Sequence, residues 1–216
     1  MITSEKNASV RLPLFIAAMC IVVALSNYLV QFPFEHFGMG NILTWGAFTY
    51  PVAFLITDLA NRQFGAVRAR NVVLIGFVLA VVLSIWLATP RIAIASGSAF
   101  LVAQLLDISI FNRLRNGNWW SAPLLSSIIG SAVDTLLFFS LAFAARFATI
   151  DTMFGHEDGS LAFAIEFFGL GFNVPLWVSL AVGDYGVKLL IALSMLIPYR
   201  ILIGNLKPTR NATVVR

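Results

Sequence analysis

Five ionisable residues lie within the apolar stretches of this 216-residue chain: Asp58, Asp107, Asp134, Asp184 and Lys188. An ionisable side chain in the hydrocarbon of a membrane costs roughly 2.5–3.5 kcal/mol, so such residues usually face a bundle interior or a water-filled space and mark ligand or ion paths. Carboxylates in such a place can accept hydrogen bonds from the N–H groups of a polar ligand. We therefore predict a binding site inside a membrane protein.

The midplane set consists of four polar residues at similar depth, Gln104, Asp134, Asp184 and Lys188. Asp184 and Lys188 are four residues apart and can pair on one helix face, which leaves Asp134 without a partner on its own helix. One interpretation is interhelical hydrogen bonding that only holds the bundle together. The other is a site for a small, flat, polar ligand, with Phe138 stacking on its ring.

The rim set lies near the ends of two apolar stretches and contains Asp58, Arg62, Asp107, Asn112 and Arg113. Asp58 and Arg62 are spaced i, i+4 in "FLITDLANRQFGAVRAR" and can pair. These residues could form a network that ties two helices together, or an inner gate. Both would use the same contacts, so the sequence leaves the two interpretations open.

Three more residues, Asn27, Trp45 and Tyr50, occur near the opposite ends of the first two apolar stretches. They could line an access path for the ligand. The alternative is that they pack between helices or anchor the chain at the membrane interface, where aromatic residues are common.

The composition explains why these residues must sit in a membrane. Hydrophobic residues make up 59% of the chain and charged residues 11%, with a mean hydropathy of +0.89. Soluble proteins carry about 25% charged residues. About 20 apolar residues cross the bilayer once, and a spanning segment in a chain of this kind must be helical. The predicted spans are 12–32, 42–60, 71–89, 92–112, 121–145 and 175–203.

The predicted fold class is therefore all-α, a polytopic membrane protein in which residues 1–216 form one domain with six transmembrane helices. Turn residues separate the spans, among them Gly38 to Gly40, Gly65 and Asn116 to Asn118. Between the last two spans, a polar loop precedes the apolar run "LAFAIEFFGLGFN", which is too short to cross. We predict that this run is interfacial or re-entrant.

Basic residues predict the orientation of the bundle. If the spans alternate in direction, eleven of the fourteen Lys and Arg residues fall on one side, and the positive-inside rule makes that side, with both termini, cytoplasmic. The eleven are Lys6, Arg11, Arg62, Arg68, Arg70, Arg113, Arg115, Arg200, Lys207, Arg210 and Arg216. This placement accounts for the net charge of +4 without a nucleic-acid partner.

The residues give little support for an intramembrane enzyme. His36 and His156 both fall in predicted loops, so no histidine within a span can activate a nucleophile. Cys20 is the only cysteine and has no partner for a disulfide or a zinc site. We predict no catalytic residues, no metal site and no cofactor.

Four motifs carry a resemblance to a known family: "LTWGAFTYPVAFLITDLANRQFG", "QLLDISIFNRLRNGNWWSAP", "SSIIGSAVDTLLFF" and "DYGVK". They resemble the queuosine precursor transporter family, formerly the vitamin uptake transporter family. By motif, Asp58 and Arg62 match the helix 2 signature, and Asp107, Asn112 and Arg113 the helix 4 signature. Asp134, Asp184 and Lys188 match the last two motifs.

The resemblance implies an importer in the bacterial inner membrane that takes up 7-cyano-7-deazaguanine or 7-aminomethyl-7-deazaguanine without an obvious ATPase. The partners are then a small-molecule base and the lipid bilayer; a homo-oligomer is compatible with the sequence. An alternative is the substrate-binding subunit of an ATP-driven (ECF-type) vitamin transporter, and a less favoured one is an intramembrane enzyme.

Overall fold

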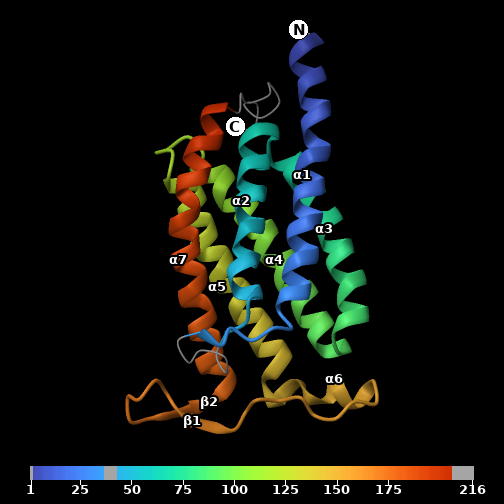
Figure 1. Ribbon diagram of the computed structural model, residues 1–216, viewed down its shortest axis with the longest axis vertical. Helices are drawn as coiled ribbons and strands as arrows, with labels where there is room; N and C mark the ends of the chain where they lie inside the picture. Colours follow the sequence, from blue (N-terminus) through green and yellow to red (C-terminus); the bar gives the residue numbers. More distant parts are fainter. Residues whose placement is uncertain (1, 37–42, 206–216) are drawn as a thin grey trace.

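Six long helices form a bundle in the computed structural model, which describes residues 2–36 and 43–205, with side chains for 11–36 and 43–204. They lie side by side along the long axis of the molecule (Figure 1). Their bounds are α1 Ile2–Leu29, α2 Gly46–Phe64, α3 Ala66–Leu87, α4 Pro90–Leu114, α5 Ser121–Phe143 and α7 Leu176–Asn205. The predicted turn at Gly38 to Gly40 lies outside the described residues.

The second helix extends beyond its predicted span, because α2 continues past residue 60 and includes Arg62. It ends at Gly65, whose positive φ of 83° suits a residue without a Cβ, and the Gly65 N–H donates to the Asn61 carbonyl. The next residue already begins α3. A one-residue turn therefore replaces the longer polar loop that the sequence suggests.

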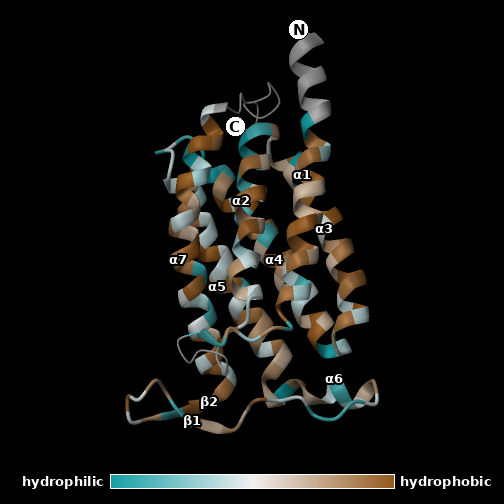
Figure 2. Cartoon of the chain, viewed as in Figure 1, coloured by the Kyte–Doolittle hydropathy of each residue, from teal (hydrophilic) through white to brown (hydrophobic). Residues whose placement is uncertain are grey.

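Five of these helices, α1 from Arg11 onwards, α3, α4, α5 and α7, are long and apolar enough to cross a membrane. Their outward faces carry large exposed apolar side chains, including Trp86 at 84% exposure and Ile197 at 68%. Figure 2 shows hydrophobic residues along most of α3 and hydrophilic ones around α6. Such a surface would not be stable in water, so the chain is a multi-pass membrane protein.

Helix α2 is outside this group of five because it is less apolar, and its position explains its composition. Thirteen of its nineteen residues are buried, and it contacts all five other long helices. The neighbouring helices shield α2 from lipid, so polar residues such as Thr57, Asp58 and Asn61 can face other helices instead of acyl chains.

The segment between α5 and α7 adds a small antiparallel sheet to the predominantly helical fold that the sequence predicts. A 3₁₀ turn, Ala145–Phe147, leads into the short helix α6, Ala148–Met153. Strands β1, Ala164–Glu166, and β2, Asn173–Pro175, then pair with Ile165 opposite Val174. The apolar run before the last helix is therefore a hairpin, and it lies at the end of the bundle opposite the start of α1 (Figure 1).

A buried arginine attaches this segment to the bundle. Arg91, at the start of α4, is 1% exposed, and its Nη1 lies 2.7 Å from Asp151 Oδ2 in α6. Its Nη2 donates to the Ala144 carbonyl at 2.6 Å, so it also holds the end of α5.

Nearby, hydrogen bonds from the hydroxyl and backbone N–H of Ser160 lower the pKa of Asp158.

Candidate functional site

A cavity of about 490 Å³ opens between α1, α2, α3, α4, α5 and α7. Its lining includes residues from the ends of helices on the hairpin side of the bundle, such as Gln31, Ala88 and Phe143, and it reaches inward as far as Lys188. Pockets for small molecules usually measure roughly 300–1,000 Å³ and combine apolar walls with a few polar groups. The cavity therefore has the size of a small-molecule site.

A charged triad forms part of the cavity wall, with Asp134 from α5 and both Asp184 and Lys188 from α7. The Lys188 Nζ lies 2.6 Å from Asp184 Oδ2 and 2.8 Å from Asp134 Oδ2. Thr135 completes the arrangement, since its hydroxyl donates to Asp184 Oδ2 at 2.8 Å and accepts from Lys188 at 3.1 Å. With all three ionised, the triad carries one net negative charge.

Spacing along its own helix gives Asp134 no partner, and the structure supplies that partner from another helix. Lys188 binds both carboxylates because α5 and α7 pack against each other at this level. Asp134 is nevertheless the more exposed carboxylate, at 19% against 12% for Asp184. Its Oδ1 accepts no hydrogen bond from the described residues, so one oxygen at the cavity wall is open to a ligand.

Aromatic residues form another part of the wall. Phe138 packs edge-on against Phe139 and Phe143, with ring centroids 5.2 and 5.9 Å apart, and all three line the cavity. Tyr50 of α2 also lines it and lies close enough to interact electrostatically with Asp134. Of these three cavity-lining rings, only Phe138 is among the predicted binding residues.

The remaining predicted binding residues are divided between the cavity and its surroundings. Asn27 lines the cavity, and its side chain bonds Ser84 and the Val23 carbonyl. Gln104 is buried between α4 and α2, where its Oε1 accepts from Thr57 at 2.6 Å, and it does not line the cavity. Trp45 also lies outside the lining, with its ring near Phe34.

One face of α2 connects the cavity with the end of the bundle that carries the start of α1. Tyr50, Phe54, Asp58 and Arg62 are four residues apart, so successive members lie about 6 Å further along the axis. Tyr50 lines the cavity, while Phe54 is 5% exposed and packs against Gly130 of α5. Asp58 and Arg62 follow beyond this aromatic residue.

The rim set separates into two parts in the structure. Arg62 and Asp58 do not pair; the Arg62 Nη1 donates to the Arg115 carbonyl at 2.6 Å, whereas Asp58 meets Asp107. Arg115 also donates to Asn112 Oδ1 at 3.1 Å. These bonds tie the end of α2 to the end of α4.

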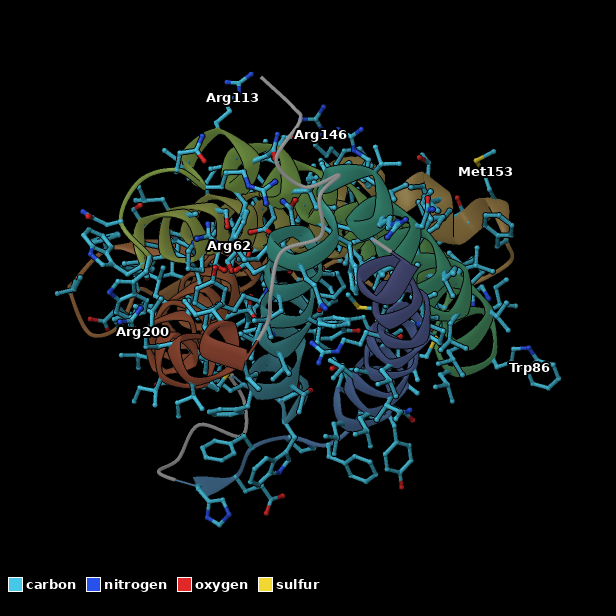
Figure 3. The ribbon with its side chains drawn as sticks, turned by 90° about the horizontal axis from the view of Figure 1, so that it is seen from above. Arg62, Trp86, Arg113, Arg146, Met153 and Arg200 are labelled. Atoms are coloured by element: carbon cyan, nitrogen blue, oxygen red, sulfur yellow. The ribbon has the colours of Figure 1, made fainter. Side chains whose placement is uncertain are left out.

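Arg113 does not take part in this network. Its side chain is exposed and points away from the bundle, whereas Arg62 lies among the helices (Figure 3). Adjacent helical residues point in different directions, so Asn112 and Arg113 cannot both face the same neighbouring helix.

We expect Gly130→Ala to destabilise the protein, because the new Cβ would lie 2.8 Å from Phe54 Cε1. Overpacking of this kind usually costs about 1–3 kcal/mol. The matched control is Gly186→Ala in α7, where a Cβ meets nothing within 4 Å. Thermal unfolding in detergent measures both variants, and equal midpoints would contradict the close packing of Phe54 on α5.

Comparison with known proteins gives consistent results. The family model described as "Putative vitamin uptake transporter" matches residues 44–89 and 82–203. The "Probable queuosine precursor transporter" of Haemophilus influenzae is 36% identical, over 81% of this chain and 85% of that protein. The "Queuosine precursor transporter" of Escherichia coli K12 is 35% identical, over 86% and 83%. No solved structure matches the chain.

Proposed function

Because the chain belongs to this vitamin uptake transporter family, we propose that it imports queuosine precursors across a bacterial inner membrane. The substrates are 7-cyano-7-deazaguanine, 7-aminomethyl-7-deazaguanine, or both, and residues 1–216 act as one transporter domain. The names of two relatives support this substrate class. The family is one of transporters, which also agrees with the prediction that the chain is not an enzyme.

The observation that carries the substrate proposal is the free Oδ1 of Asp134 at the cavity wall. A deazaguanine presents N–H groups that a carboxylate can accept, and a flat ring that can pack against aromatic faces. Its aminomethyl form is also a cation, which the net negative charge of the triad would attract. In this proposal Asp134 binds the base edge, Asp184 and Lys188 orient it, and Phe138 and Tyr50 contact the ring.

For the other predicted residues we propose indirect roles. Gln104 supports the site through its bond to Thr57, and Asn27 shapes the cavity wall. Trp45 belongs to the outer membrane interface. Arg62 and Asn112, with Arg115, form the inner gate, since their bonds link α2 to α4 at one end of the bundle.

We further propose six membrane spans with both termini in the cytoplasm. Helix α2 needs fewer apolar residues than the others because they surround it. The start of α1 and the last turns of α7 lie at one end of the bundle (Figure 1). The α2–α3 turn and the end of α4 lie at the same end and bring Arg68 and Arg115 there. Basic residues at this end favour the cytoplasmic side. The hairpin, with Phe168 and Leu170 exposed, then lies at the outer interface. A fluorescent protein fused after Arg216 that stays dark in cells would contradict this orientation.

Restoration of queuosine in tRNA tests the function. The chain is expressed in bacteria that can neither make these precursors nor import them, and each base is supplied in the medium. We expect queuosine-modified tRNA, measured by mass spectrometry, with at least one base and none with the empty vector. Lack of modification with both bases, despite protein in the membrane, would contradict the proposal.

Purification of the protein from the same cells tests whether it works with an ATPase partner. We propose that the chain needs no ATPase module, so the tagged protein should purify without an ATP-binding partner. An ATPase that co-purifies in stoichiometric amount would instead favour the substrate-binding subunit of an ATP-driven transporter.

A further inference from the structure

Two carboxyl groups meet inside the bundle on the far side of Phe54 from the cavity. Asp58 of α2 is 2% exposed and Asp107 of α4 is fully buried, and their side chains are within hydrogen-bonding contact. No Lys, Arg or His of the described residues forms an ion pair with either of them. Among the described residues, neither buried oxygen of Asp107 accepts a hydrogen bond of good geometry, and the Ser126 hydroxyl is the nearest donor.

This contact is favourable when the pair holds a proton. Two ionised carboxylates side by side repel each other, and burial adds a desolvation cost to each charge. A single shared proton removes one charge and supplies the missing donor, as in other carboxyl pairs that share a proton. The close approach of Asp58 and Asp107 therefore suits a site that binds one proton.

The groups around the pair are hydroxyls and arginines that bond elsewhere, so a proton is the cation that can neutralise it. From α5, the Ser126 hydroxyl donates to Asp58 Oδ1 at 3.4 Å. From α7, Tyr199 faces Asp58, and both line a small cavity. Arg62 and Arg115 lie towards the helix ends, where they donate to backbone carbonyls of α4 and α2.

Two serine hydroxyls and a small cavity lie between the pair and the binding cavity. The small cavity beside Asp58 has a volume of about 10 Å³, which is room for about one water molecule. Ser127 and Ser131 of α5 line it as well, and the buried Ser131 hydroxyl has no hydrogen-bond partner among the described residues. Ser131 precedes Asp134 by about one helical turn, so it lies close to the charged triad.

We propose that the Asp58–Asp107 pair is the proton-binding site that couples import of the base to the entry of one proton. This inference rests on the proposed transport function. The proton arrives from the outer cavity through Ser131 and Ser127, binds the pair and leaves to the cytoplasm. Its loss makes α2 and α4 repel each other next to the Arg62–Arg115 contact, which opens the inner end.

This coupling can be tested with purified full-length protein in lipid vesicles. The substrate is 7-cyano-7-deazaguanine, because it has no amine that titrates. The aminomethyl base is measured in parallel. For one proton per neutral base, about one pH unit, acidic outside, should give roughly tenfold accumulation. A pH-sensitive dye inside the vesicles should record proton entry with the base. Asp58→Asn and Asp107→Asn should lose accumulation but still exchange labelled for unlabelled base. Glu157→Gln, in an exposed loop, is the matched control.

The outcomes separate the two proposals. Exchange without any effect of the pH gradient in the wild-type protein would overturn proton coupling and leave the transport function intact. Accumulation driven by a sodium gradient instead would also overturn it. Absence of uptake and exchange for both bases would contradict the transport function itself. If neither Asn variant can be purified, the wild-type protein tests the coupling. Proton entry with the base supports it, and base entry without protons overturns it.

Discussion

Replacement of Asp134 by Asn should lower the uptake of 7-aminomethyl-7-deazaguanine by roughly ten- to a hundredfold. The substitution keeps the shape of the side chain but removes its charge, so Lys188 and Asp184 become a neutral pair. A hydrogen bond to a charged group contributes about 1.5–3 kcal/mol, and about 1.4 kcal/mol corresponds to a factor of ten. The loss should therefore appear as a higher concentration needed for half-maximal uptake.

The cyano base provides an internal comparison for this variant. It is neutral, and an amide oxygen can still accept from its N–H groups, so its uptake should fall by no more than about tenfold. Initial uptake rates at low concentration of each base measure the difference. Glu157→Gln is the matched control, because its carboxylate is in an exposed loop. Equal losses for both bases would show that the charge of Asp134 does not contribute to recognition of the cationic aminomethyl base.

Replacement of Lys188 by Met should destabilise the folded protein by about 3–5 kcal/mol, as expected when one partner of a buried ion pair is removed. The side chain is 5% exposed and holds Asp134 and Asp184 together. Without it, the Thr135 hydroxyl is the remaining hydrogen-bond partner of the Asp184 carboxylate among the described residues. For a chain of this size the midpoint of thermal unfolding should fall by roughly 6–20 °C.

A second substitution tests the physical cause. Asp184→Asn in the Lys188→Met background removes one of the two carboxylates that the lysine had neutralised, so it should restore most of the lost stability. Residues in one ion-pair network usually couple by about 0.5–3 kcal/mol. Midpoints of the wild type, both single variants and the double variant in the same detergent measure this coupling. Additive effects would show that Lys188 does not act through Asp184.

The long apolar helices and the meeting of three charged residues at one level could be predicted from the sequence. An unbroken apolar run of about 20 residues has few alternatives to a membrane helix, because every backbone group must be satisfied within the segment. The same reasoning placed Asp134, Asp184 and Lys188 at one level, and the structure brings them together. The hairpin was not predicted as a sheet, since its short apolar run lacks the length that identifies a span.

Only the tertiary structure decided which charges meet. Spacing along one helix suggested that Asp58 pairs with Arg62 and that Asp134 stands apart, yet Asp58 faces Asp107 and Asp134 binds Lys188. A spacing of four residues places two side chains on one face, but it does not say which neighbouring helix that face meets. That choice depends on the rotation and packing of α2, α4, α5 and α7, which involve contacts between residues far apart in the chain.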